Sequence, residues 1–247
     1  MKPLRSNPTF NSILTSFENP FMGILAGATF TALIQSSSAT TVMLVSFVNS
    51  GLINFSQALG VILGSNIGST VTAQIVAFKV TDYALLLIAS GSIMALFSKK
   101  DNIKNIGFVI LGFGLLFYGM KIMSDTMKPL RSDPTFNAIL TSFENPLLGI
   151  LAGAVFTALV QSSSATTGIV ITLASGGSIT LEAGIPLILG ANIGTTGTIW
   201  LAGALVSDGM PKGDTLRIAM AHTGVNLFMA MTLLPFVHPI ARLLSRF

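Results

Sequence analysis

Two clusters of polar side chains interrupt otherwise apolar stretches of the sequence. The run Gln35–Thr41 reads QSSSATT, and Gln161–Thr167 repeats it letter for letter. In each run, six of the seven side chains carry an oxygen atom. Neutral hydroxyl and amide oxygens suit Na⁺, whereas hydroxyl and backbone N–H groups at a helix start suit an oxyanion. Both chemistries are therefore available at a single interruption of a helix.

A second pair of motifs combines glycine with amide and hydroxyl side chains. Gly64–Thr70 reads GSNIGST, and Gly190–Thr196 reads GANIGTT. Glycine lets the backbone open and approach an ion, and Asn, Ser and Thr can then coordinate it. We therefore interpret each of these motifs as a second helix break.

Both motifs recur at one offset of 126 residues, which indicates an internal duplication. Met1–Thr41 returns as Met127–Thr167, with roughly 35 of 41 positions identical. We assign residues 1–102 to a first transmembrane repeat and residues 103–247 to a second. The apolar run Asn105–Met120 precedes the second copy and has no counterpart before the first, so we expect a shortened or minimal version of the fold.

The composition places the chain in a membrane. It has 247 residues, of which 51% are hydrophobic and 9% charged, and a mean hydropathy of +0.78. A soluble domain of this size needs more polar surface. The fold class that we predict is an all-α polytopic membrane protein with two repeats and broken or re-entrant helices. An odd number of spans per repeat would give inverted-topology repeats, and the spans alone leave the orientation open.

Most of the apolar segments are shorter than the ~20 residues that cross a hydrocarbon core. That shortness favours broken helices or re-entrant hairpins. The expected segments are at about 20–34, 38–53, 57–64, 66–78, 83–98 and 105–123 in and after the first copy, and at 146–160, 164–176, 183–190, 192–206 and 216–236 in the second.

Several classes of function are disfavoured by the residue inventory. The net charge of +4 is not accompanied by a basic face with stacking aromatic residues, so no nucleic-acid partner is expected. The sequence offers no cysteine, no Ser/His/Asp set, no metal-ligand cluster and no P-loop, so we predict neither an enzyme nor a cofactor. His222 lies inside an apolar segment, and we expect it to hydrogen-bond a neighbouring helix, with a proton-relay or substrate contact as the alternative.

The paired QSSSATT and G-x-N-I-G-[ST]-T motifs resemble those of the type II sodium/phosphate cotransporter family, in particular its bacterial members. The resemblance covers nearly the whole chain and implies inverted repeats with phosphate held jointly by the two QSSS breaks. It implies phosphate contacts at Gln35, Ser36, Ser37, Gln161, Ser162 and Ser163. It also implies sodium ligands at Ser38, Thr41, Asn66, Ser164, Thr167, Asn192, Thr195 and Thr196. The division of residues between the two ligands stays open.

The resulting functional hypothesis is sodium-dependent symport of inorganic phosphate, with Na⁺ as the coupling ion and membrane lipid as the surroundings. The alternatives are a transporter of another oxyanion, a membrane phosphate sensor or regulatory subunit that binds without transporting, and a passive anion channel. The resemblance implies a multi-pass protein of a prokaryotic inner membrane. Oligomeric state is left open, with a homodimer as one option.

Overall fold

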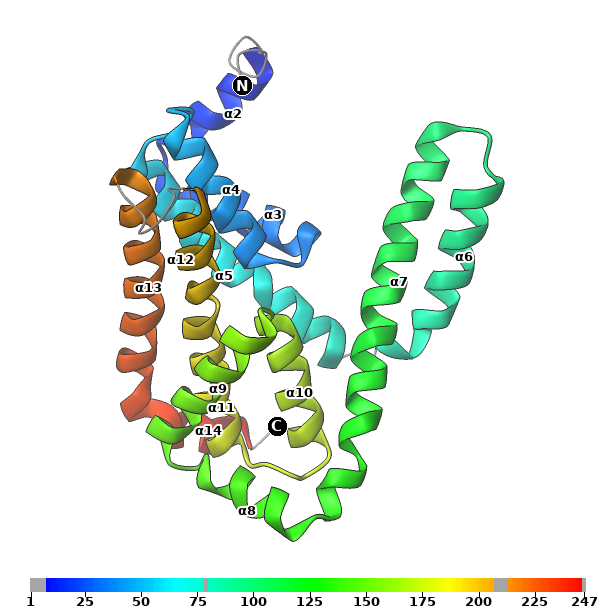
Figure 1. Cartoon of the computed structure of the whole chain (residues 1–247), viewed down its shortest axis with the longest axis vertical. Helices are drawn as coiled ribbons and strands as arrows, with labels where there is room; N and C mark the ends of the chain where they lie inside the picture. Colours follow the sequence, from blue (N-terminus) through cyan, green and yellow to red (C-terminus); the bar gives the residue numbers. More distant parts are fainter. Residues whose placement is uncertain (1–7, 78–79, 207–212, 246–247) are drawn as a thin grey trace.

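The computed structural model describes residues 8–77, 80–206 and 213–245, and within these ranges every regular element is a helix (Figure 1). The first copy contains α2 (Pro8–Ser16), α3 (Pro20–Ile34), α4 (Ser37–Asn49), α5 (Phe55–Ala77), the 3₁₀ turn η1 (Val80–Tyr83) and α6 (Ala84–Phe97). The rest contains α7 (Asp101–Met127), η2 (Pro129–Ser132), α8 (Pro134–Ser142), α9 (Pro146–Val160), α10 (Ser163–Ser175), α11 (Leu181–Gly194), α12 (Thr196–Val206), α13 (Gly213–Leu233), η3 (Leu234–Phe236) and α14 (Val237–Leu244). The predicted all-α membrane fold is confirmed.

Each copy of the duplicated segment folds into a short helix followed by a helical hairpin and a crossing helix. Figure 1 shows α2, α3 and α4 in the upper part of the molecule and α8, α9 and α10 in the lower part. The sequence FENP begins both hairpins in the same way. Asn19 and Asn145 accept backbone N–H groups of the first turn, and the following prolines occupy a position where no N–H is needed.

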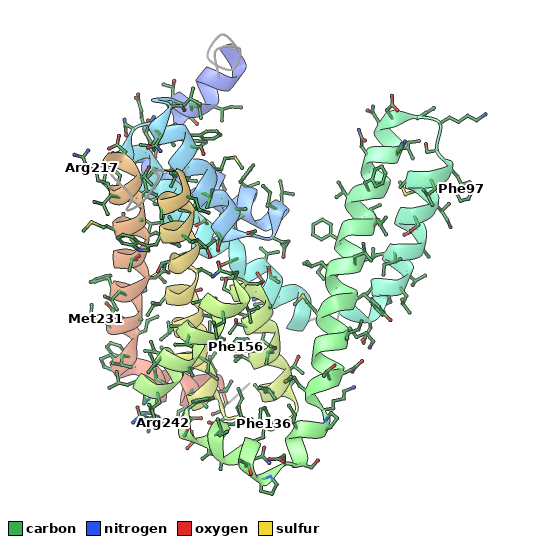
Figure 2. The ribbon with its side chains drawn as sticks, viewed as in Figure 1. Phe97, Phe136, Phe156, Arg217, Met231 and Arg242 are labelled. Carbon is green, nitrogen blue, oxygen red and sulfur yellow. The ribbon has the colours of Figure 1, made fainter. Side chains whose placement is uncertain are left out.

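Several of the described helices have the length and apolarity to cross a bilayer. The runs Asp101–Met127, Leu181–Leu205 and Gly213–Leu244 do so as single helical runs. Helices α8 and α9 are long and apolar enough only as a pair, and the bend of 110° between them is that of a broken span or a re-entrant loop. Large apolar side chains point outward along these helices. Phe97 is 79% exposed on the α6/α7 hairpin, whose α6 arm projects away from the remaining helices while α7 packs on α10 (Figure 2). Such a surface suits contact with lipid and not with water.

The crossing helices pack against the hairpins through glycine. A Cβ atom added at Gly64 of α5 would lie 2.0 Å from the carbonyl oxygen of Ile24, and one added at Gly190 of α11 would lie 2.0 Å from that of Ile150. Gly68 and Gly194 face α3 and α9 in the same manner. The missing side chains let two helix backbones touch, as small residues do in membrane helix pairs.

This packing corrects the predicted second break. Helix α5 runs unbroken through Gly64–Thr70, so the segments expected at 57–64 and 66–78 form one helix. In the second copy, α11 ends at Gly194 and α12 begins at Thr196, within a run that still counts as one span. The motif glycines serve close approach of helices, and in α5 the backbone keeps its hydrogen bonds because it remains helical.

We expect Gly64→Ala to destabilise the protein, because the new methyl group must push α3 away from α5. Overpacking of this kind costs roughly 1–3 kcal/mol. Thermal unfolding of the purified protein in detergent would measure it. Gly112→Ala is the matched control, since an added Cβ there meets nothing within 4 Å. Equal melting temperatures for the two variants would contradict the role given to Gly64.

Candidate functional site

The QSSS motifs interrupt their helices in one and the same conformation. Helix α3 ends at Ile34, Gln35 takes the left-handed conformation (φ 60°, ψ 25°), and Ser36 is extended before α4 begins. Gln161 (φ 61°, ψ 24°) and Ser162 repeat this between α9 and α10. The predicted break at each QSSS motif is confirmed.

The conformation of the two glutamines is unusual. Among the described residues, Gln35 and Gln161 are the only non-glycine residues with positive φ. A left-handed residue with a side chain costs roughly 1–2 kcal/mol, and such strain persists only where the surroundings impose it. Identical strain at two equivalent positions points to a shared role for these turns.

Hydrogen bonds inside each hairpin hold the turn in place. The Gln35 N–H donates to the carbonyl oxygen of Thr31 at 2.7 Å, and its side-chain Nε2 donates to that of Ala32 at 2.5 Å. The hydroxyl groups of Thr31 and Thr40 join the two arms at 2.8 Å. In the second hairpin, Thr157 and Thr166 make the same link at 2.7 Å, and both threonine pairs are buried.

The second arm of each hairpin begins with free amide groups. Ser36 caps α4 by accepting the Ala39 N–H at 3.1 Å, and Ser162 caps α10 by accepting the Ala165 N–H at 3.2 Å. Helix geometry leaves the first two amides of each arm without an intrahelical acceptor. The aligned dipoles add about half a positive charge at this end. Each break can therefore attract an anion without a basic side chain.

The two halves of the chain meet at Thr72 of α5. Its hydroxyl donates to the Gln35 side-chain oxygen at 2.5 Å, and it accepts a long hydrogen bond of 3.4 Å from Ser164. In the second half, Thr198 of α12 donates to the Gln161 side-chain oxygen at 2.6 Å. Helix α10 packs on α5, and α4 packs on α12. Each hairpin therefore lies beside the crossing helix of the other half.

The sequence interpretation missed Thr72 and Thr198, which hold the glutamine side chains. It also missed Thr31 and Thr157, which tie the hairpin arms together. A usable signal was present, because Thr72 and Thr198 coincide under the 126-residue offset, as do Thr31 and Thr157.

The residues predicted to bind phosphate all lie at the two breaks, Ser37 and Ser163 being buried and Ser36 and Ser162 half-buried. The residues predicted to bind sodium are more dispersed. Of these, Ser164 bonds Thr72 across the halves, whereas Thr41, Thr195 and Thr196 donate to carbonyl oxygens three or four residues earlier in the chain. The remaining four, Ser38, Asn66, Thr167 and Asn192, are half-buried.

Asn66 lies beside α13 and donates to the side-chain oxygen of Asn226 at 3.0 Å. Asn226 in turn donates to the backbone oxygen of His222 at 2.9 Å. Within the described residues, no hydrogen bond joins Asn66 to a QSSS residue. About six residues of helix separate Asn66 from Thr72, a rise of roughly 9 Å. Asn66 therefore belongs to a second polar cluster, next to the breaks along α5.

His222 corrects a further expectation. Its side chain is fully buried, and neither ring nitrogen has a hydrogen-bond partner within the described part of the chain. The predicted hydrogen bond to a neighbouring helix is therefore wrong. A buried donor and acceptor left unpaired cost about 1–3 kcal/mol each, so water or a ligand is the expected partner of this ring.

The fold and the breaks together define a class of protein. Several helices are too short to span the membrane. They are interrupted near their contact with the other half and carry polar groups at the interruption. This is the architecture of a secondary transporter. The sequence model described as Na+/Pi-cotransporter matches the chain twice, over residues 5–125 and 116–244. The chain belongs to this family, which is a family of transporters and not of enzymes.

The chain is similar to curated proteins of bacteria and of animals. It is 30% identical over 231 residues to the "Putative inorganic phosphate export protein YjbB" of Salmonella typhimurium, covering 93% of this chain and 42% of the relative. It is 31% identical over 226 residues to the "Uncharacterized protein YqeW" of Bacillus subtilis, covering 91% and 72%. It is 33% identical over 138 residues to human "Sodium-dependent phosphate transport protein 2B", covering 53% and 20%. No solved structure matches the chain.

These comparisons confirm the predicted family and an integral membrane location, and the bacterial relatives agree with a prokaryotic inner membrane. The chain spans less than half the length of YjbB, although it spans most of YqeW.

Thr72→Val should loosen the contact between the halves, because it removes a donor to Gln35 and an acceptor for Ser164. At about 1 kcal/mol for each lost hydrogen bond, we expect a lower melting temperature in detergent. Thr126→Val on α7 is the matched control, since its exposed hydroxyl bonds only within its own helix. A Thr72→Val protein as stable as wild type would argue against this junction.

Proposed function

We propose that the chain is a sodium-dependent phosphate symporter that binds phosphate and Na⁺ between its two QSSS breaks. The observation that carries the proposal is the pair of identical, strained helix breaks, connected through Gln35, Thr72 and Ser164. A membrane helix keeps such an interruption only where its exposed backbone groups are satisfied. A transported ion is the partner that this family membership supports.

Phosphate is the ligand that suits the starts of α4 and α10. The free amides of the first turn and the hydroxyls of Ser37 and Ser163 donate hydrogen bonds, and the two helix dipoles favour negative charge. The sequences of α3, α4, α9 and α10 contain no charged residue. In this proposal, binding of the anion relies on fixed dipoles, hydroxyl groups and a bound cation in place of arginine.

Sodium supplies the positive charge that the site otherwise lacks. The sodium ligands that we propose are the set predicted above, with carbonyl groups freed at the breaks as further donors. A cation beside an anion in a low-dielectric site strengthens the binding of both. Each ligand should therefore raise the affinity for the other, and a phosphate affinity independent of Na⁺ would refute that coupling.

The repeats at residues 1–102 and 103–247 are, in this proposal, inverted relative to each other. The two matches of the family model support the duplication, and the opposite placement of α2 and α8 supports the inversion (Figure 1). Inversion would bring the tips of both hairpins together near the middle of the bilayer.

Export is a second candidate, favoured by the name of the YjbB relative. Radiolabelled phosphate in whole cells that express the chain would separate the two directions. Accumulation that requires external Na⁺ supports symport into the cell, whereas faster loss of preloaded phosphate supports export.

The principal test is phosphate uptake into proteoliposomes with an inward Na⁺ gradient, compared with an inward K⁺ gradient. We expect uptake with Na⁺ only, and its loss in Ser37→Ala combined with Ser163→Ala, because both helix starts lose a hydroxyl donor. The matched control is Ser12→Ala combined with Ser90→Ala. Both control positions are exposed, and the equivalent of Ser12 in the second copy is already Ala138.

The outcomes separate the alternatives. Uptake that persists without a Na⁺ gradient would indicate a passive channel, and binding of phosphate without uptake would indicate a sensor. Sulfate that competes with phosphate at every pH would indicate a broader oxyanion transporter. Unchanged uptake in the Ser37→Ala, Ser163→Ala protein would place the site elsewhere.

A further inference from the structure

An apolar pocket lies beside the second QSSS hairpin. It encloses about 340 Å³ between α8, α9, α10 and α11, and the end of α7 closes one side. Of its described lining residues, all are apolar except Thr166. Its main walls are Phe136, Leu140, Phe143, Phe156, Val170 and Leu173. The volume is at the lower end of the ~300–1,000 Å³ of typical ligand pockets.

The first copy carries larger side chains at the equivalent positions of its hairpin. Val170, Leu173 and Ala174 of α10 correspond, under the 126-residue offset, to Leu44, Phe47 and Val48 of α4. Leu44 and Val48 belong to a buried core that also includes Leu14, Val45 and Ile53, and Phe47 packs against that core. Val170 and Leu173, which line the pocket, are therefore smaller than their counterparts in α4, and Ala174 beside them is smaller than Val48.

The pocket is continuous with the lipid-facing surface of the protein. Phe156 on α9, which Figure 2 labels, and Leu130 of η2 both line the pocket. Their exposed fractions are 42% and 37%. The outer face of α9 continues with exposed Leu147, Leu151 and Leu159. In a bilayer, the medium in contact with such a surface is the acyl chain of lipid. An empty apolar space of this size would forfeit many dispersion contacts.

We propose that this pocket binds one acyl chain of a membrane phospholipid. The pocket offers no charged group, so the lipid headgroup stays outside and only the hydrocarbon chain enters. At about 30 Å³ for a water-sized group, the space holds on the order of ten such groups. This matches a segment of one chain and not a whole lipid. The inference does not depend on which ion the breaks bind.

The bound acyl chain can act on the second break through the residues that it contacts. Thr166 lines the pocket. Its hydroxyl group also forms a hydrogen bond of 2.7 Å with that of Thr157, which joins the hairpin arms. The acyl chain fills the space between α10 and α8 and so stabilises the position of the arm that begins at Ser163. The first hairpin has this support built in, through Leu44, Phe47 and Val48.

The test is photolabelling in nanodiscs with a phosphatidylcholine that carries a diazirine in the middle of one acyl chain. Labelled residues are then mapped by mass spectrometry. Bulk lipid labels exposed side chains, but Leu140 and Leu173 are only 5% and 4% exposed. We expect label on these two buried residues in the wild-type protein. The exposed α6/α7 hairpin, including Phe97, is the internal reference for bulk lipid.

Reciprocal exchange between the copies gives matched variants. Val170→Leu with Leu173→Phe and Ala174→Val should abolish labelling of Leu140, relative to Phe97. Leu44→Val with Phe47→Leu and Val48→Ala should create new labelling at Leu14, the equivalent of Leu140. Wild-type protein without label on Leu140 or Leu173, or labelling that both exchanges leave unchanged, would overturn the proposal.

The second exchange keeps the test decisive if the first variant fails to fold, because its own pocket is untouched. Melting temperatures in detergent and in nanodiscs distinguish a variant that folds with a filled pocket from one that fails to fold. Lipid should stabilise the wild type more than the pocket-filled variant, since only the wild type gains a ligand that binds the folded state.

Discussion

The constraint that shapes this molecule is the need of a backbone inside a membrane to satisfy its own polar groups. A broken helix leaves amides and carbonyls without intrahelical partners, and lipid offers none. At each QSSS turn, a serine cap, a left-handed glutamine and a threonine pair across the hairpin supply hydrogen bonds in place of the missing helical ones. The first amides of α4 and α10 remain without an intrahelical acceptor, and these are the groups that the proposed function assigns to phosphate.

The crossing helices explain how such turns become rigid. Helix α5 must approach the α3/α4 hairpin closely enough for Thr72 to reach the Gln35 side chain at 2.5 Å. Gly64 and Gly68 make that approach possible because no side chain separates the two backbones. The glycine motif and the QSSS motif therefore act together. The glycines set the distance between the helices, and at that distance the QSSS glutamine can bond Thr72.

The sequence predicted the helical membrane fold, the duplication and the QSSS breaks, because a dense run of polar side chains in an apolar segment needs partners that an unbroken, lipid-facing helix does not provide. It could not distinguish a glycine that opens a helix from one that lets two helices touch. The prediction for Gly64–Thr70 was wrong for that reason, and only the position of α3 resolves it. Thr72 escaped notice because a single threonine in a membrane helix is common. The unpaired ring of His222 depends on what surrounds α13, which local sequence does not encode.

The duplication also sets a physical condition on the proposed transport. The two turns share one backbone conformation to within 1° in φ and ψ, so both breaks present the same local arrangement of backbone groups. A transporter that exposes its site alternately to two sides needs two states of similar free energy. Two turns of one conformation favour that balance, and the sequence differences between the arms bias it. The smaller residues Val170, Leu173 and Ala174 are such a difference, since they make the packing of the second arm depend on the surrounding lipid, whereas the packing of the first arm is fixed by its own side chains. On this view, the composition of the membrane biases which arm moves more easily, although the chemistry at the two breaks is the same.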